Sequence, residues 1–159
     1  MVRIRKIVSG DRGKINMILV DTGFFTTAEI DVAMELVDIF LTKPDQKDYA
    51  VYVAEEEGTR ICGYMCFGPT PVAEGTYDLY WIAVDPSFQN QGIGKKLLGF
   101  MEHEMSRLRG RLIIIETSSQ EKYKATQDFY LRSGYHLAAR IKDFYKPGDD
   151  RMIYTKYIN

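Results

Sequence analysis

The sequence predicts an α/β protein built around one mixed β-sheet, and three observations carry this prediction. Segments in which apolar and polar residues alternate, as in strands, are interspersed with segments whose apolar residues recur at helical spacing. Their order is one strand, two helices, three strands, a helix, a strand, a helix and two strands. The 159 residues, 45% hydrophobic and 27% charged, suffice for one domain with its own core. We therefore expect a single domain over residues 1–159.

The beginning of the chain should supply one strand and two helices. Residues 2–7 alternate apolar and basic side chains, as a half-buried strand does, and a short helix should follow over residues 11–20. Thr26 and Glu29 have the spacing of a capping box, in which each side chain bonds the other residue's backbone N–H. A second helix should therefore start there, and it should end before Pro44.

The middle of the chain should supply three strands. Residues 49–54 and 61–67 are apolar enough to pair across an acidic, glycine-containing turn. Residues 76–84 are rich in aromatic and β-branched side chains, which strands favour, and this strand should end at Asp85-Pro86. The sheet is therefore expected to be antiparallel at first.

The last part of the chain alternates helices and strands. A helix from Ile93 has apolar side chains at helical spacing and should stop at Gly110, because glycine commonly ends helices. The remaining elements are a strand, a helix and two strands, at residues 111–116, 124–132, 135–141 and 152–157.

The composition argues against several kinds of partner. The formal net charge is −1, so no overall positive field would attract nucleic acid. No apolar run reaches the roughly 18 residues of a membrane span, and the N-terminus lacks a signal peptide's apolar centre, so we expect a cytoplasmic protein with no membrane partner. Cys62 and Cys66 lie too far apart along one strand to bond, and His103 and His136 lack zinc-binding spacing. We therefore expect buried free thiols and no metal.

The stretch from Gln89 to Lys96 carries two glycines and two lysines where a helix should begin. Gly92 and Gly94 leave the backbone bare for a ligand, and the first turn of a helix offers N–H groups without intrahelical partners. Lys95 and Lys96 add formal charge to the helix dipole, so the loop suits a phosphate group. A plain tight turn is the alternative. Neither the Walker A nor the Rossmann spacing of glycines fits this loop.

Two longer segments resemble the motifs of one known family. Residues 82–94, IAVDPSFQNQGIG, are similar to motif A of the GNAT family of N-acetyltransferases, whose signature is Gln or Arg, two residues, Gly, one residue, then Gly or Ala. Residues 123–135, YKATQDFYLRSGY, resemble motif B, a helix that carries a tyrosine followed by Gly-Tyr or Gly-Phe. The two motifs have the usual order and separation, and the order of elements agrees along nearly the whole chain.

The resemblance implies a GNAT-like α/β fold: a mixed, mostly antiparallel seven-stranded sheet, flanked by about four helices and splayed between the fourth and fifth strands. It also implies acetyl-CoA as the acetyl donor. The main chain of the strand at residues 76–84 would hold the pantetheine arm of acetyl-CoA. The backbone amides of the loop that follows this strand would hold the pyrophosphate. The residues assigned to these contacts are Ile82, Ala83 and Val84 on the strand, and Gln89, Asn90, Gln91, Gly92, Ile93, Gly94 and Lys95 on the loop.

The resemblance further suggests two catalytic residues. Tyr130 matches the motif B tyrosine that protonates the departing thiolate in many members, with a core aromatic as the alternative. Asp78 stands six residues before Val84, where one branch of the family places its catalytic glutamate. A carboxylate among aromatic side chains is poorly solvated, which suits a base, although an exposed charge or an anchor for the substrate ammonium would also fit. Tyr80 and Glu116 are the alternative candidates for the catalytic base.

The acceptor is the least defined part of the site. Many family members have asparagine where this chain has Tyr123, so no role is assigned to Tyr123. Phe24, Phe25 and the segment 143–150 put aromatic rings beside carboxylates, which suits a small cationic amine, although a solvated hairpin tip fits equally. We expect direct transfer, in a ternary complex, to a primary amine of a small molecule such as an amino acid. A protein or peptide acceptor, a silent acyl-CoA-binding regulatory module and a homodimer remain open.

Overall fold

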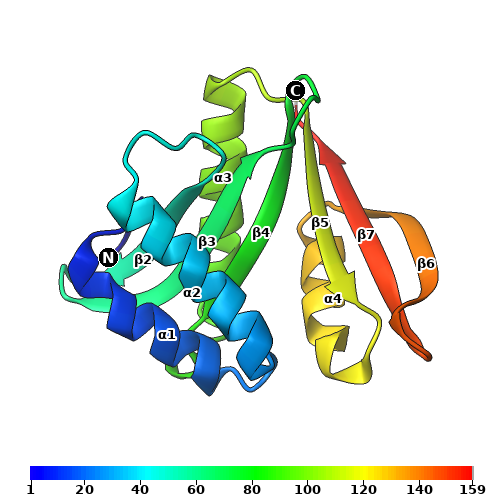
Figure 1. Ribbon diagram of the computed structural model, residues 1–159, viewed down its shortest axis with the longest axis horizontal. Helices are drawn as coiled ribbons and strands as arrows, with labels where there is room; N and C mark the ends of the chain where they lie inside the picture. Colours follow the sequence, from blue (N-terminus) through cyan, green and yellow to red (C-terminus); the bar gives the residue numbers. More distant parts are fainter. Residues whose placement is uncertain (159) are drawn as a thin grey trace. The chain divides into compact units, whose positions relative to one another are not determined.

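The computed structural model describes residues 1–158, and its elements follow the predicted order (Figure 1). The strands are β1 (Val2–Lys6), β2 (Ala50–Glu56), β3 (Arg60–Pro69), β4 (Thr76–Val84), β5 (Leu112–Ser118), β6 (His136–Lys146) and β7 (Asp149–Tyr157). The α-helices are α1 (Arg12–Asp21), α2 (Thr27–Thr42), α3 (Ile93–Arg107) and α4 (Lys124–Arg132). The short 3-10 helices are η1 (Ser9–Asp11), η2 (Pro86–Phe88) and η3 (Glu121–Tyr123).

The sheet is mixed and mostly antiparallel, as predicted. Within residues 1–158 it has seven strands in the order β1-β2-β3-β4-β5-β7-β6. The pair β4–β5 is parallel, whereas β1–β2, β2–β3, β5–β7 and β6–β7 are antiparallel. The parallel ladder runs from Thr76, opposite Leu112, to Leu79, opposite Ile115. Residues 80–84 of β4 lie beyond this ladder, at the place where a splay is expected.

The chain forms two compact units. The first consists of Met1–Gly68 and Tyr80–Glu104, and the second of Pro69–Leu79 and the described residues from Met105 onward. Strand β4 and helix α3 each contribute residues to both units. A single domain over residues 1–159 stays a prediction, and residue 159 lies outside the described chain.

In the first unit, α1 and α2 cover one face of the sheet and α3 the other (Figure 1). Ile15 of α1 and Val37 of α2 are buried in one cluster with Val53 of β2. Successive strand residues point to opposite faces, and the ring of the neighbouring Tyr52 lies 4.8 Å from that of Phe100 in α3. Strand β2 is therefore covered by helices on both faces.

Helix α2 begins and ends where predicted. The Thr26 N–H donates to Glu29 Oε2 at 2.6 Å, and the Glu29 N–H donates to Thr26 Oγ1 at 3.2 Å, which completes the capping box. The helix ends at Thr42, two residues before Pro44. Within residues 1–158, no helix combines the length and apolar character needed to cross a membrane.

The end of α3 differs in detail from the prediction. Arg109, not Gly110, has the left-handed backbone, with φ 60°. The Arg109 N–H donates to Ser106 O at 3.2 Å and the Gly110 N–H to Met105 O at 2.7 Å, which is a Schellman arrangement. Gly110 serves close packing instead, because a Cβ there would lie 2.9 Å from Met105 Cε.

Strands β6 and β7 are longer than residues 135–141 and 152–157. Lys146 pairs with Asp149 across Pro147-Gly148, and Gly148 has φ 82°. The charged residues around this tip therefore continue the ladder instead of forming a long loop. Glycine makes so tight a turn possible because it adopts positive φ without steric cost.

Candidate functional site

The predicted cofactor loop connects β4 to α3 in the first unit. Asp85 begins the turn, and its Oδ1 accepts the Ser87 N–H at 2.9 Å. Asn90 and Gly92 both have left-handed backbones, with φ 61° and 81°, immediately before α3 starts at Ile93. Among residues 1–158, no atom would come within 4 Å of a Cβ on Gly92. This glycine thus meets both requirements of a ligand-holding loop, which are positive φ and open space beside the backbone.

The loop ends in a helix N-terminus that faces solvent. Gln89, Asn90, Gln91 and Gly92 are exposed, while Ile93 is 4% exposed and anchors the helix. The Lys96 N–H donates to Gly92 O at 3.0 Å, so intrahelical bonding begins there and the preceding N–H groups face outward from the first turn. With exposed Lys95 and Lys96 beside them, these groups suit an anion such as a pyrophosphate.

Gly63 in β3 positions this helix, and the sequence analysis missed it. A Cβ on Gly63 would lie 3.0 Å from Ile93 Cγ2, 3.1 Å from Leu97 Cδ1 and 3.4 Å from Ala83 O. The absence of a side chain therefore lets the first turn of α3 pack closely on the strand next to β4. An isolated glycine inside a strand was the available signal, because it often marks a close approach.

The strand residues assigned to the pantetheine arm differ in burial. Ala83 is buried in the core beneath α1 and α2, whereas Ile82 and Val84 are half-buried. All three follow Leu79, where the parallel ladder with β5 ends. Main-chain groups beyond such a ladder are the ones that an extended ligand can bond.

Tyr130 lies inside the second unit, on α4. Its side chain is 4% exposed, and its ring centroid lies 5.8 Å from that of Tyr154 and 6.2 Å from that of Tyr135. Burial, followed by the charge of Tyr154, raises the pKa of Tyr130 well above its ordinary value. The phenol is therefore a protonated donor at neutral pH.

Asp78 lies in the second unit as well, but the ladders place it on the other face of the sheet. Leu79 pairs with Ile115, and Ile115 pairs with Tyr154, so these three side chains share the face that Tyr130 contacts. Asp78 is the neighbour of Leu79 and therefore points to the opposite face. The structure thus does not bring the two predicted catalytic side chains to one face.

The surroundings of Asp78 are partly polar. Its side chain is half-buried, and Oδ2 accepts a hydrogen bond of 2.7 Å from Thr70 Oγ1. A hydroxyl that donates to the carboxylate fixes the orientation of the side chain. Asp78 therefore has a defined position, which both a base and an ammonium anchor require.

The other residues singled out in the sequence have distinct environments. Tyr80 is 41% exposed. Glu116, the second fallback base, is paired with the guanidinium of Arg151. Tyr123 stands at the N-cap of α4, and Lys122 Nζ lies 5.2 Å from the centroid of its ring.

The carboxylates of the segment 143–150 correct one expectation about the acceptor. Asp149 is 3% exposed and accepts hydrogen bonds from Ser118 Oγ at 2.5 Å and Gln120 Nε2 at 2.6 Å. Asp150 is 7% exposed and pairs with Arg140 at 2.5 Å. Both groups join strands and loops of the second unit, so neither of them is an exposed attractor of an ammonium, whereas Asp143 in the same segment is exposed.

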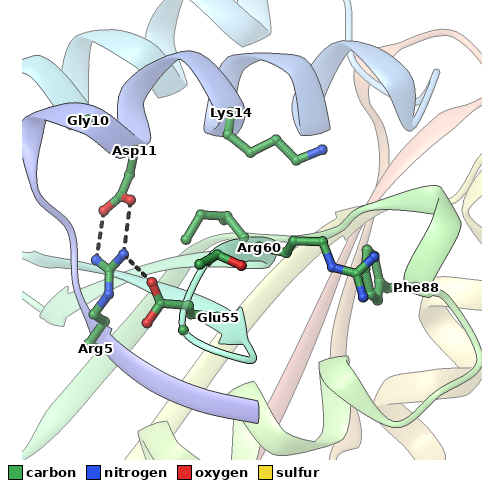
Figure 2. A pocket seen from close by; sticks show the side chains of 10 residues that line it. Arg5, Gly10, Asp11, Lys14, Glu55, Arg60 and Phe88 are labelled. Carbon is green, nitrogen blue, oxygen red and sulfur yellow. Dashed lines mark hydrogen bonds and ion pairs between the residues drawn. The ribbon is translucent and has the colours of Figure 1, made fainter. Parts of the chain in front are cut away.

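A cavity of about 540 Å³ lies in the first unit beside the cofactor loop (Figure 2). Arg5 crosses one side, bonded to Asp11 at 2.8 Å and to Glu55 at 2.9 Å. On the opposite side the guanidinium of Arg60 lies 5.2 Å from the ring centroid of Phe88. The lining residues are Arg5, Gly10, Asp11, Lys14, Glu55, Gly58, Thr59, Arg60, Ile61 and Phe88.

The fold and site define an α/β protein with a mixed sheet, whose fourth strand leads through a bare loop into an exposed helix N-terminus of the kind that suits a phosphate group. Residues 47–137, more than half of the chain, match the model of the acetyltransferase (GNAT) domain. The chain therefore belongs to the GNAT family of acetyltransferases, as the two motifs predicted.

Three relatives place the chain within this family. It is 31% identical over 101 residues to S-(2-succino)cysteine N-acetyltransferase of Bacillus subtilis, and the matched region covers 62% of this chain and 61% of that relative. It is 26% identical over 127 residues to S-alkylcysteine N-acetyltransferase of the same organism, covering 75% of this chain and 70% of the relative. A crystal structure of a GNAT-family protein from Desulfovibrio desulfuricans matches all of both chains, with 42% identity and a TM-score of 0.95.

Proposed function

We propose that this protein is an N-acetyltransferase that moves the acetyl group of acetyl-CoA to a primary amine of a small molecule, by direct transfer in a ternary complex. The observation that carries the proposal is the loop before α3. Gly92 has positive φ and open space beside it, next to exposed amides and lysines at a helix N-terminus. Membership of the GNAT family supports the same activity.

The loop and strand would hold the cofactor in two ways. Backbone amides from Gln89 to Lys95 would bond the pyrophosphate, with the positive end of the α3 dipole behind them. Main-chain groups of Ile82, Ala83 and Val84 would bond the pantetheine arm. When bound, acetyl-CoA supplies an activated acetyl thioester.

Two side chains of the second unit are proposed to move protons. Tyr130 would give its phenolic proton to the departing sulfur, and its raised pKa keeps that proton in place until the transfer. Asp78 would take a proton from the attacking amine. Because Asp78 points to the face of the sheet opposite the one that Tyr130 contacts, this removal would run through water.

The acceptor is proposed to be the amine of an amino acid with a sulfur-linked substituent. Both Bacillus subtilis relatives are named for acetylating S-substituted cysteines. In the first unit, Phe25 packs against Trp81 with ring centroids 5.3 Å apart, and Phe24 packs against Phe25 at 6.5 Å. This aromatic cluster adjoins the strand residues assigned to the cofactor and offers an apolar wall to a thioether side chain.

Calorimetry with acetyl-CoA, and with ATP as a control, tests the cofactor assignment. Asparagine tolerates positive φ, so Gly92→Asn should keep the loop's path and place a side chain in the ligand's space. We expect this variant to bind acetyl-CoA more than about tenfold more weakly, above about 1.4 kcal/mol. A folded variant that titrates like the wild type would refute the loop assignment.

Release of free CoA in a panel of amines tests the acceptor. The panel should contain S-alkylcysteines, S-(2-succino)cysteine, other amino acids and peptides with free N-termini. Turnover of S-substituted cysteines above the rest is the expected result, and preference for peptides would replace the small-molecule acceptor. Binding of acetyl-CoA without turnover of any amine would favour a silent regulatory module.

A further inference from the structure

Lys14 connects helix α1 to the beginning of the cofactor loop. Its side chain extends from α1 along the cavity of Figure 2, and its Nζ lies 2.6 Å from Asp85 Oδ2. The Asp85 side chain is 9% exposed, whereas that of Lys14 is 36% exposed. The pair therefore joins a nearly buried carboxylate to a partly solvated ammonium.

Asp85 is the residue at which β4 turns into the loop. Its N–H donates to Cys62 O at 2.9 Å, which fixes it to β3. Its Oδ1 accepts the Ser87 N–H at 2.9 Å, and its carbonyl accepts the Phe88 N–H at 2.8 Å. Four contacts, counting that with Lys14, therefore set the direction in which the chain leaves the strand.

The charge on Asp85 depends on these contacts. Burial alone would raise the pKa of Asp85, but hydrogen bonds from Lys14 and the Ser87 amide outweigh it and hold the pKa below its ordinary value. A nearly buried carboxylate that loses its cation must draw in water or turn outward. Either change would release the Ser87 N–H and with it the first turn of η2.

A second side chain holds the other end of η2 less firmly. The guanidinium of Arg60 lies 5.2 Å from the ring centroid of Phe88 and also pairs with Glu56 at 2.7 Å. The Arg60 side chain is 62% exposed, so water screens both contacts. Lys14 is therefore the stronger of the two supports.

We propose that Lys14 is a positioning residue, which acts through Asp85 to hold the turn before the cofactor loop in the conformation that binds acetyl-CoA. This inference rests on the proposed function of the loop. Because the turn is already ordered before binding, the free energy of binding is not reduced by the cost of ordering residues 85–92. Lys14 acts without touching the cofactor, so its loss should change affinity and leave the chemical step intact.

The test combines binding, kinetics and hydrogen exchange. Lys14→Met keeps the aliphatic stem and removes the charge. We expect it to weaken acetyl-CoA binding about tenfold and to raise KM for acetyl-CoA with kcat nearly unchanged. Amide exchange in residues 86–92 should become faster. Lys14→Arg, which keeps the charge, should restore most of the affinity.

Arg12→Met is the matched control, because Arg12 lies on the same helix and pairs with Asp38 at 2.5 Å with both side chains about half exposed. It should leave binding and loop exchange unchanged. In an Asp85→Asn background, Lys14→Met should add almost no further loss. A loss that persists there would overturn the proposal, since Lys14 would then contact the cofactor itself.

Two further results separate this inference from the proposed function. If the wild type binds acetyl-CoA and folded Lys14→Met binds it equally well, the inference is wrong and the proposed function stands. If the wild type binds no acetyl-CoA, the proposed function is wrong. Amide hydrogen exchange in residues 86–92 then tests whether Lys14 holds the turn. Faster exchange in Lys14→Met upholds that role, and unchanged exchange overturns it.

Discussion

Burial keeps the phenol of Tyr130 protonated, as its proposed role requires. Because its surroundings disfavour the phenolate, the folded-state pKa lies above the ordinary value of about 10. The hydroxyl therefore keeps its proton over the pH range in which the enzyme would work. By linkage, the neutral phenol contributes stability that is fully present below about pH 10 and is lost as the pH rises through the folded-state pKa.

Tyr130→Phe should lower turnover by about a hundredfold while KM for acetyl-CoA changes little, because the substitution keeps the ring and removes the proton. Steady-state rates with varied acetyl-CoA check this. Tyr135→Phe is the matched control, since Tyr135 packs in the same aromatic cluster and has no proposed part in the chemistry. Equal turnover in the wild type and Tyr130→Phe would make Tyr130 a core residue.

Asp78→Asn tests the proposed base. A carboxylate that accepts the amine's proton gives the rate a limb that rises from acid pH, and the nearly isosteric asparagine should remove or displace it. Binding of acetyl-CoA should not change. The measurement is kcat/KM against pH at saturating acetyl-CoA. A variant that raises KM for the amine but keeps the pH profile would make Asp78 an ammonium anchor.

The loop and the first turn of α3 could be predicted from the sequence because their determinants are local. Gly92 provides positive φ, and apolar residues from Ile93 onward mark the helix. Gly63 could not be placed in the same way, since its importance depends on which strand lies under α3. The end of α3 was misplaced by one residue because either of two neighbours can adopt the left-handed backbone, and here Arg109 does.

The segment between β6 and β7 shows why contacts between residues far apart in the chain could not be predicted from local sequence patterns. Its aspartates are polar residues beside Pro-Gly, a pattern typical of a solvated tip. In the structure, Asp149 is buried by bonds to Ser118 and Gln120, about 30 residues away in the chain. The face on which Asp78 lies depends in the same way on the pairing of β4 with β5 and of β5 with β7.

Strand β4 and helix α3 run through both compact units of the chain. Residues 76–79 of β4 belong to the second unit and residues 80–84 to the first, and α3 divides after Glu104. Unfolding of either unit would therefore cut short β4 and α3, which continue into the other unit. The cofactor loop belongs to the first unit and Tyr130 to the second.

We therefore expect the chain to unfold in one cooperative transition. Trp81, the only tryptophan of the sequence, lies in the first unit, so its fluorescence follows that unit during denaturation by urea. Hydrogen exchange in β5 and β7 follows the second unit at the same urea concentrations. Coincident midpoints are the expected result, because loss of either unit removes strand or helix residues continuous with the other. A Trp81 transition clearly separated from that of β5 and β7 would show two independently stable units and contradict a single domain.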